Sequence, residues 1–472
     1  LTNADGMPVD LYRVVMNKDA AGLVTFSFLD EVAINGPTDG SEKAIELISG
    51  RLGLRDPGID VTLTSGGDDF KIPAESALWL GSGATVRASG NNTGIWLDGR
   101  FTIGYGANAL IDEGTNNYIE YSASGNAELI LNSGDNTLRV GSQIRRNTVT
   151  EGGILDFSMD AASSTVVLGT KADLGGAANR GVLELVNAGS SFSQVESATL
   201  TIANAVPGAT APALDIQSDA SISLGDGSAI VFGNAGTETG QDFALYSSKP
   251  LKNLQLSNAS GNNPQVTLNT VSLTADTLTI DAGTTFDANG LDITLNGDFV
   301  AYGSFTPSGN TTYFSGTANQ EIYGSPAFYN LTKSTANTLT LNADITVNNE
   351  LRLQDGTLAD GGNTLNAKGY VWMDANHNHG GTGDGIRLNG NSQQYVHGNG
   401  TFGKMTVNNS NDIYVPDGNT ITIADHLKMV SGVFDIGKNL LVVQETASIE
   451  AATPFDANNM VQTNISFTDA GI

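Results

Sequence analysis

The sequence predicts an all-β protein, a right-handed parallel β-helix (β-solenoid) of roughly twenty coils. Three observations lead to this prediction: short runs in which apolar and polar residues alternate, clusters of turn-forming residues between the runs, and a long internal repeat. We expect the inside of the coils to be a stack of Leu, Ile, Val and Phe side chains.

The alternating runs occur along almost the whole chain. Apolar residues at every second position are typical of β-strands, and Gly, Asn and Asp between the runs are typical of turns. The runs follow one another at about 6–8 residues, which is too close for the helical crossovers of a βαβ protein. Clear examples are 77–80, 95–97, 129–131, 166–168, 183–185, 222–224, 339–341 and 421–423.

A sandwich or barrel of antiparallel hairpins is the alternative to a solenoid, and the internal repeat favours the solenoid. Phe314 matches Leu388 at a distance of 74 residues, and after an insertion near 416–418 Gly356 matches Gly432 at a distance of 76 residues. Insertions within turns are expected of stacked coils. Fainter copies of the same pattern are found at 12–18, 45–50, 253–254 and 278–283.

We divide the chain into three segments. Residues 1–73 are predicted to be solenoid coils with a faint repeat, 74–250 degenerate solenoid coils, and 251–472 a solenoid with repeats of about 75 residues. No Pro-rich or Ser-rich linker marks a boundary. Neither end carries an obvious solenoid cap, so we expect the chain to be a segment of a longer protein.

Composition excludes several functional classes. The chain has 472 residues, a formal net charge of −28 and no Cys, so there is no disulfide framework. The excess of negative charge repels nucleic acid and anionic membrane surfaces, and neither is an expected partner. No stretch approaches the roughly 18 consecutive apolar residues of a membrane span, and we expect none.

The repeat over 319–365 has the pattern NQxIxG, three residues, FYNLT, and then TLTLxxDIxVxxxLxLxxGTLxxGGNTL. This pattern resembles the β-helix repeats of very large surface proteins of Bacteroidetes, which are cargo of the type IX secretion system and include the SprB-type gliding adhesins. The resemblance implies export, an extracellular place on the bacterial cell surface, and a role in adhesion, surface filaments or gliding. It also implies cell-surface proteins, extracellular glycans or further coils of the same long chain as partners.

One polar loop is a candidate calcium site. The loop 374–385 starts with acidic and amide residues at positions i, i+2 and i+4. This is the spacing at the start of an EF-type calcium loop, whose oxygen ligands suit Ca²⁺. His379 stands where that loop requires Gly, and Gly385 stands where it requires the bidentate Glu, so a plain polar loop is the competing interpretation. His377 and His379 are alternative ligands for a transition metal. The candidate calcium ligands are Asp374, Asn376, Asn378 and Asp384.

We expect a structural and adhesive protein that is not an enzyme. The alternative is a glycan-binding or glycan-cleaving β-helix of the tailspike or polysaccharide-lyase kind. Exposed aromatic side chains along one groove would favour binding, and carboxylates clustered with Lys or Arg on one face would favour cleavage. Arg145 and Arg146 are consecutive and point to opposite sides of a strand. Trp79, Trp96 and Trp372 could stack on sugar rings, but Trp79 and Trp96 lie in alternating runs and we expect them in the core or stacked between coils.

Overall fold

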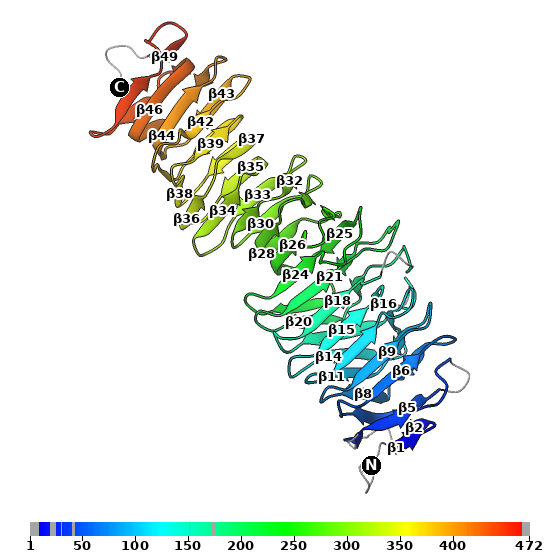
Figure 1. Cartoon of the computed structure of the whole chain (residues 1–472). Helices are drawn as coiled ribbons and strands as arrows, with labels where there is room; N and C mark the ends of the chain where they lie inside the picture. Colours follow the sequence, from blue (N-terminus) through cyan, green and yellow to red (C-terminus); the bar gives the residue numbers. More distant parts are fainter. Residues whose placement is uncertain are drawn as a thin grey trace. The chain divides into compact units, whose positions relative to one another are not determined.

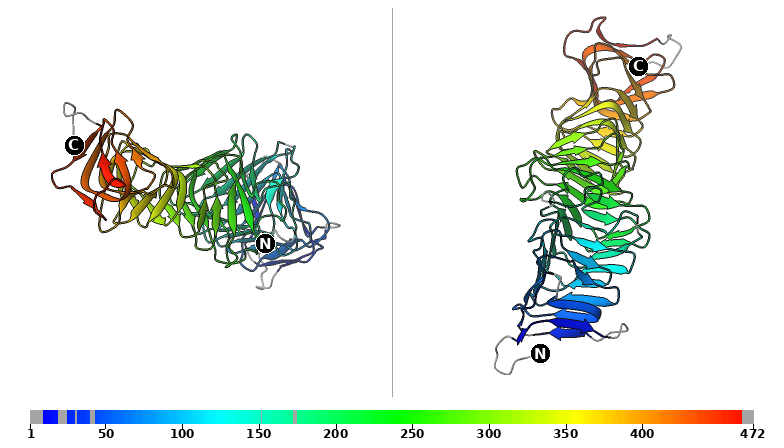
Figure 2. Two further views of the ribbon diagram at one scale, coloured as in Figure 1. Left: turned by 90° about the horizontal axis from the view of Figure 1, so that it is seen from above. Right: turned by 90° about the vertical axis from the view of Figure 1, so that its right-hand side faces the viewer.

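The computed structural model of the chain is a parallel β-solenoid of the right-handed type with about 19 turns, which confirms the predicted fold class (Figure 1). The structure describes residues 9–18, 25–29, 31–39, 43–150, 152–171 and 175–464. These residues form 49 strands and no helix. Each strand pairs in parallel with its counterparts in the neighbouring coils, and Figure 2 shows this stacking within each part of the chain from two further sides.

The contacts divide the chain into two units, Leu1–Val271 and Ser272–Ile472. The expected boundary at 73/74 lies between two stacked coils of the first unit, and the one at 250/251 directly precedes a strand of the same unit. The two units are described separately below.

In the first unit a complete coil has three strands, so that equivalent strands form three columns. The first column contains β2 (Val14–Asn17), β3 (Thr25–Phe28), β5 (Ile45–Leu54), β8 (Ser76–Leu80), β11 (Arg100–Ile103), β14 (Asn126–Leu131), β17 (Ile154–Met159), β20 (Ser191–Gln194) and β23 (Ser221–Leu224). The second contains β6 (Asp60–Thr64), β9 (Thr85–Ala88), β12 (Asn108–Ile111), β15 (Thr137–Val140), β18 (Thr165–Leu168), β21 (Thr199–Ile202), β24 (Ala229–Phe232) and β26 (Leu251–Leu256).

The third column contains β7 (Phe70–Ile72), β10 (Ile95–Leu97), β13 (Ile119–Tyr121), β16 (Ile144–Arg146), β19 (Leu183–Leu185), β22 (Leu214–Ile216), β25 (Asp242–Ser247) and β27 (Gln265–Leu268). A separate pair near the start is formed by β1 (Val9–Leu11) and β4 (Val32–Ile34).

The core of the first unit is built from side chains that stack in register from coil to coil. In the third column, one inward row has members that are each at most 1% exposed, and burial of such a side chain contributes about 1.5–3 kcal/mol. The row runs without a break through 74–250, so these coils continue the stack. Its members are Phe70, Ile95, Ile119, Ile144, Leu183, Leu214, Leu245 and Leu268.

The second unit has the same construction with shorter coils. Its strands are β28 (Leu273–Ile280), β29 (Thr285–Asp287), β30 (Ile293–Leu295), β31 (Phe299–Ala301), β32 (Ser304–Thr306), β33 (Thr311–Phe314), β34 (Gln320–Gly324), β35 (Ala327–Lys333), β36 (Thr338–Leu341), β37 (Ile345–Leu353), β38 (Thr357–Ala359), β39 (Thr364–Ala367), β40 (Tyr370–Met373), β41 (Asn376–Asn378), β42 (Gly385–Leu388), β43 (Gln394–His397), β44 (Thr401–Asn408), β45 (Ile413–Tyr414), β46 (Thr420–Asp435), β47 (Leu440–Val443), β48 (Ser448–Ala451) and β49 (Asn459–Gln462).

Matching residues of the repeat have matching conformations. Gly356 and Gly432 both have positive φ, at +72° and +94°. At both positions a Cβ would overlap a backbone oxygen of the preceding coil, that of Asn337 and that of Asn409 respectively. The repeat therefore keeps Gly where the backbone is left-handed and a second chain segment passes closely.

The repeat is out of step with the coils. From Phe314 the same column continues through Lys333 and Leu353 to Met373, three coils later. Leu388, the repeat partner of Phe314, lies further along the chain in a neighbouring column, where it pairs with Ala367. Successive copies of the repeat therefore place equivalent residues on successive faces of the second unit.

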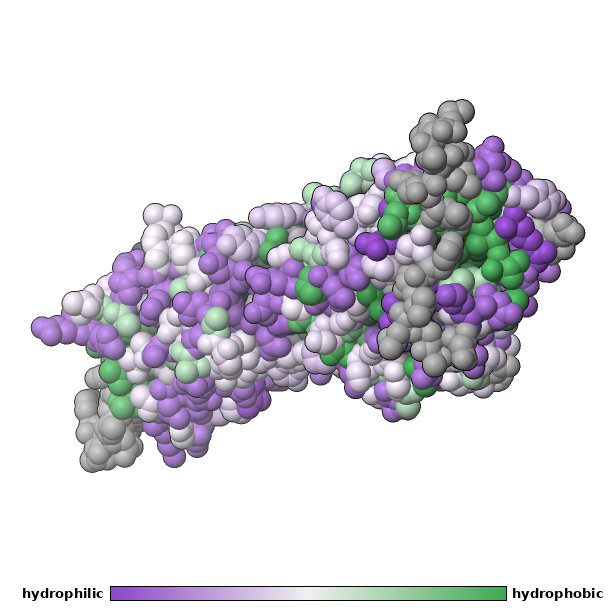
Figure 3. All heavy atoms as spheres, turned by 90° about the horizontal axis from the view of Figure 1, so that it is seen from below, coloured by the Kyte–Doolittle hydropathy of each residue, from purple (hydrophilic) through white to green (hydrophobic). Residues whose placement is uncertain are grey.

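The surface is largely hydrophilic. Figure 3 shows one side of the molecule, where polar residues predominate and hydrophobic residues are scattered except for a group at one end, at the right of the view. This distribution agrees with a core enclosed by the coils, because strand alternation sends one row of side chains inward and the next outward.

Candidate functional site

Aromatic side chains line the outer surface of one column in the second unit. Neighbouring strands place Trp372 beside His397, and Tyr395 beside Tyr414. Alternate residues of a strand point to the same side, so Tyr370 shares the outer side with Trp372. We call these five residues, Tyr370, Trp372, Tyr395, His397 and Tyr414, the aromatic strip.

Trp372 is enclosed between two side chains of the adjacent coils. Its ring centroid is 4.0 Å from that of His397, and the two planes differ by 8°. From the preceding coil the Arg352 guanidinium carbon lies over the indole at 5.1 Å from the ring centroid. His397 and Arg352 thus cover the two faces of the indole, which leaves its edge for any ligand.

The tyrosines of the strip are oriented differently. The ring centroids of Tyr370 and Tyr414 are 5.5 Å and 5.8 Å from that of Tyr395, and their planes are rotated from it by 75° and 83°. Tyr370 is 46% exposed. Tyr370 and Tyr414 lie two strands apart, a separation of about twice 4.8 Å. They therefore stand on either side of Tyr395 and nearly perpendicular to it.

Polar groups accompany the rings. Burial lowers the pKa of His397 below its ordinary value of 6.5, and Glu350 opposes this only in part, so the imidazole is uncharged at neutral pH. The Tyr395 hydroxyl donates to Gln393 Oε1 at 2.9 Å. Glu350 and Asp435 stand in register with the tyrosines at the two ends of the strip. The surface thus combines aromatic rings with hydrogen-bonding groups.

The four candidate calcium ligands all belong to the second unit and have three different local surroundings. Asp374 Oδ1 accepts a hydrogen bond from the backbone N–H of Asn399 at 3.2 Å. Asn376 and Asn378 are both exposed on β41, one on each side of the buried His377. The calcium site stays a prediction.

Asp384, the fourth candidate, lies among cations. Its Oδ1 accepts a hydrogen bond from Lys428 Nζ at 2.9 Å, and its Oδ2 is 3.4 Å from Arg387. Burial would raise the pKa of Asp384, but Lys428 and then Arg387 outweigh it and hold that pKa below its usual value. A calcium ion at this carboxylate would have to compete with Lys428.

The two candidate histidines share one buried carboxylate. Asp360 Oδ2 is 3.0 Å from His377 Nε2 and 2.7 Å from His379 Nδ1, while Oδ1 accepts the backbone N–H groups of Gly362 and Gly380. Burial would raise the pKa of Asp360, but these hydrogen bonds outweigh it and hold the pKa well below its ordinary value. The group closes a turn between coils, and the sequence analysis missed Asp360.

Burial lowers the pKa of His377, and Asp360 opposes this only in part. The His377 Nδ1 atom is buried without a hydrogen-bond partner in the described part of the chain. No group of three or more His, Cys, Asp or Glu side chains suited to a metal ion occurs among the described residues. Within the same residues no helix has the length and hydropathy that a membrane span requires.

The first unit carries a row of charged residues on the outer side of its third column. Glu120 is paired in register with Arg145, and Glu184 with Asp215. Arg145 Nη2 is 2.8 Å from Glu120, and the Arg145 guanidinium carbon lies over the Tyr118 ring at 4.4 Å from its centroid. This is the combination of carboxylates and Arg on one face that favours a cleavage site.

Glu184 of this row is already fully engaged. It is 1% exposed, forms an ion pair with Arg180, and accepts the backbone N–H groups of Arg146 and Gly181. Burial would raise the pKa of Glu184, but Arg180 and these amides outweigh it and lower that pKa. Burial raises the pKa of Asp215, which contacts Gln217. The bonding of Glu184 is typical of a carboxylate that holds structure together.

The tryptophans of the first unit lie on the outside of the coils. Trp79 and Trp96 are both half-buried, so the core alternative for them was wrong. Arg55 lies over the Trp79 ring at 4.3 Å, and Lys71 lies over the Trp96 ring at 5.9 Å. Each indole thus stacks with a cation rather than with another ring.

Comparison of the chain with protein-family models, curated proteins and solved structures finds no match. From the sequence, Trp372 was named as a possible sugar-stacking residue, but the other four residues of the aromatic strip were not found. A signal was present, because Tyr370 and Trp372 are two residues apart, as are Tyr395 and His397. This signal predicts the strip only if the lengths of the intervening coils are known, because those lengths decide whether the two pairs lie in the same strand column.

Proposed function

We propose that this chain is a secreted β-solenoid of a bacterial cell surface that adheres to extracellular glycans through the aromatic strip. The observation that carries the proposal is the alignment of five rings on one outer column, with Tyr370 and Tyr414 on either side of Tyr395. Aromatic rings bind sugars because the C–H faces of a pyranose pack on the π-surface while its hydroxyl groups reach neighbouring polar groups.

The geometry suits an extended chain of sugars. Tyr370 and Tyr414 are separated by about twice the 4.8 Å strand spacing, which is close to the length of a disaccharide. Glu350, Gln393 and Asp435 provide acceptors beside the rings. A linear glycan that lies along the column would meet one tyrosine with every second sugar.

One carboxylate of the charged row in the first unit, Glu184, argues for binding over cleavage. The carboxylate of Glu184 is occupied by Arg180 and by backbone amides, so it is not available as a nucleophile or base. The surface location rests on the resemblance of 319–365 to exported repeats, and the acidic composition without Cys suits it.

The proposal is tested by titrating purified bacterial and algal polysaccharides into the chain and its variants. Tyr370→Ala and Tyr414→Ala are each expected to weaken binding by about tenfold, or about 1.4 kcal/mol. Tyr302→Ala is the matched control, because Tyr302 is a 62% exposed tyrosine of the same unit outside the strip.

Equal loss of binding in Tyr302→Ala, or no loss in the strip variants, would contradict the proposal. The same incubations should be assayed for new reducing ends and for unsaturated sugars. Turnover of any polysaccharide would support the glycan-cleaving alternative instead.

A further inference from the structure

One outer face of the second unit carries small uncharged side chains that lie in register from coil to coil. It belongs to the column formed by β36, β38, β41 and the opening residues of β44 and β46 (Figure 1). Neighbouring strands are about 4.8 Å apart, so the side chains repeat regularly from one coil to the next. The first row of this face consists of Thr338, Thr357, Asn376, Thr401 and Thr422.

A second row lies beside the first, because every second residue of a strand points to the same side. It consists of Thr340, Ala359 and Asn378, which are in register on β36, β38 and β41. Along each strand the two rows are separated by two residues, or about 6.6 Å. We call the residues of these two rows the threonine face.

The side chains of the threonine face are directed at solvent. Its threonines are half-buried, and both of its asparagines are exposed. The hydrogen bonds among the described residues do not involve the side-chain oxygen and nitrogen atoms of the face. Thr338, for example, takes part through its backbone N–H, which donates to Asn319 Oδ1 at 3.0 Å. The hydroxyl and amide groups of the face are therefore left to bind water.

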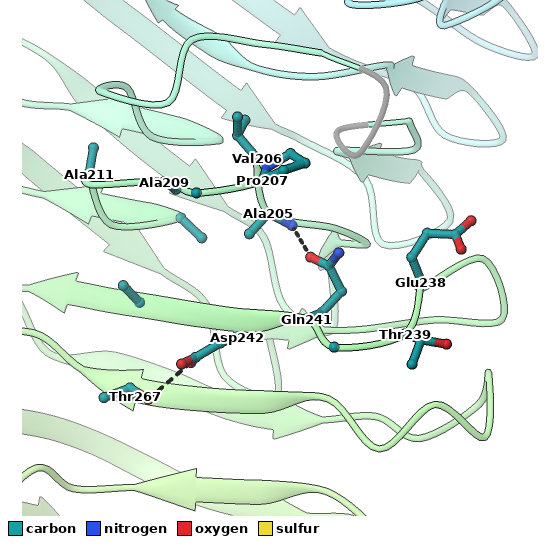
Figure 4. Close-up of a pocket in the computed structure, with 14 residues that line it drawn as sticks. Ala205, Val206, Pro207, Ala209, Ala211, Glu238, Thr239, Gln241, Asp242 and Thr267 are labelled. Atoms are coloured by element: carbon teal, nitrogen blue, oxygen red, sulfur yellow. Dashed lines mark hydrogen bonds between the residues drawn. The ribbon is translucent and has the colours of Figure 1, made fainter.

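Polar side chains elsewhere on the coils bond to the protein instead. In a pocket of the first unit, the Thr267 hydroxyl donates to Asp242 at 3.0 Å, and the Gln241 side-chain oxygen accepts the backbone N–H of Ala205 at 2.8 Å (Figure 4). An outward threonine of a coil is thus not always open to solvent, and the regular open rows distinguish the threonine face.

The threonine face is uncharged in a strongly acidic chain. The chain contains 50 Asp and Glu residues and has a formal net charge of −28, yet neither row contains a charged residue. The second row is bounded by Glu321, which is in register with Thr340 in the preceding coil. A surface without charge complements a partner that is itself uncharged, and an ionic partner would gain little from it.

Threonine suits the recognition of a regular surface. Its branched Cβ restricts the χ1 angle, so a row of threonines holds hydroxyl and methyl groups at fixed positions. The hydroxyl groups bind water, and the methyl groups favour an ordered layer of water above them. The two spacings of the face, about 4.8 Å between strands and about 6.6 Å along a strand, are in the range of the oxygen spacings on a prism face of hexagonal ice.

We propose that the threonine face binds ice. The two rows hold a layer of water that fits both the protein and the crystal, and the solenoid then adsorbs to the ice surface and slows its growth. This activity goes beyond the glycan adhesion proposed above. It uses another column of the same unit and does not depend on the aromatic strip.

The test is the thermal hysteresis of the purified chain, which is the gap between the melting and freezing temperatures of a seeded ice crystal. The chain is expected to open a gap that grows with protein concentration and to give the crystal flat faces. A fluorescently labelled sample should also be taken up into the ice of a slowly freezing solution, from which proteins that do not bind ice are excluded.

Substitutions in the first row locate the surface. Thr357→Tyr and Thr401→Tyr each place a bulky ring in the middle of the row, so each is expected to lose most of the thermal hysteresis. Thr346→Tyr makes the same change at a half-buried threonine of β37, on another column of the unit, and should keep it. Tyr370→Ala in the aromatic strip should also keep it.

Unfolding midpoints of all variants separate loss of ice binding from loss of fold. Exclusion of the unsubstituted chain from ice without thermal hysteresis overturns the proposal, as does an equal loss of hysteresis in Thr346→Tyr and Thr357→Tyr. Loss of polysaccharide binding in the strip variants would leave ice binding unaffected, so the two proposals fail separately.

Discussion

Gln320 and Gln394, 74 residues apart, make equivalent hydrogen bonds in two copies of the repeat. Each side-chain oxygen accepts the backbone N–H of the Gly four residues earlier, at 3.0 Å and 2.7 Å. Each side-chain nitrogen donates to two backbone carbonyls of the preceding coil. Both glutamines are 1% exposed. A buried Gln thus links consecutive coils where the chain turns.

Replacing either glutamine by Leu should destabilise the second unit. Gln320→Leu removes a hydrogen-bond partner from the Gly316 N–H and from the Leu295 and Gly297 carbonyls, and a buried group left without any partner costs about 1–3 kcal/mol. The measurement is the shift of the denaturant midpoint. Gln354→Leu, at an exposed position of the same unit, is the control, and an equal shift in the control would contradict the assigned role.

Gly432→Ala should be more harmful than Gly418→Ala. Both residues have φ near +90°, so both substitutions carry the cost of a left-handed backbone, which exceeds about 1 kcal/mol. Only at Gly432 would the new Cβ also overlap a backbone oxygen, that of Asn409, whereas the space around Gly418 is open. Thermal unfolding of the two variants isolates the cost of the close approach, and equal midpoints would contradict it.

Neutralising Glu184 should destabilise the first unit strongly. Glu184→Gln leaves the buried Arg180 without its counter-charge, and loss of one partner from a buried ion pair costs about 3–5 kcal/mol. The double variant Glu184→Leu with Arg180→Met removes this pair but leaves Arg146 and the backbone N–H groups of Arg146 and Gly181 without Glu184, so it should recover only part of that loss. Denaturant titration of the three proteins provides the comparison, and a double variant less stable than Glu184→Gln would count against it.

The stability of the second unit should fall in two steps as the pH is lowered. The pKa of His377 is below 6.5 in the fold, so below pH 6.5 the unfolded chain binds a proton that the folded chain does not. The lowered pKa of Asp360 adds a second loss below its ordinary 3.8. Unfolding midpoints against pH should show a smaller upper step in His377→Gln and a smaller lower step in Asp360→Asn. If the variants' plots of unfolding midpoint against pH ran parallel to that of the unsubstituted chain, this assignment would be refuted.

Calcium binding at the predicted loop should depend on Lys428. Because Lys428 Nζ is 2.9 Å from Asp384, Lys428→Met should increase the affinity of the loop for Ca²⁺ by removing a competing cation. Asp374→Asn should lower it. Calorimetric titration with Ca²⁺ measures both changes, and the absence of binding in every variant would remove the loop as a calcium site.

The fold could be predicted because its signals are local. Alternation in runs such as 339–341 decides which residues face inward, and the spacing of the runs excludes helical crossovers. Tertiary roles were harder to predict, as the glutamines show. Gln320 and Gln394 have the same 74-residue offset as Phe314 and Leu388, but only the coil geometry reveals that each glutamine links two coils.

The candidate sites could be predicted only in part for the same reason. Asp384 was chosen as a ligand from its position in a loop, yet its neighbour Lys428 comes from two coils further along. The aromatic strip depends on two successive coils of different length, which place Tyr395 beside Tyr370 and Tyr414 beside Tyr395. Contacts between coils depend on every intervening turn, and a residue count cannot provide them.

The mismatch between repeat and coil gives the second unit an approximate screw symmetry. Phe314 and Leu388 occupy neighbouring faces, so a surface feature encoded in the repeat recurs rotated around the axis rather than directly above itself. A chain with many such copies would present the equivalent outward-facing residues of each copy in a spiral. A partner could then contact such a residue from any side of the solenoid. A point mutation in one copy would change the surface on one side only.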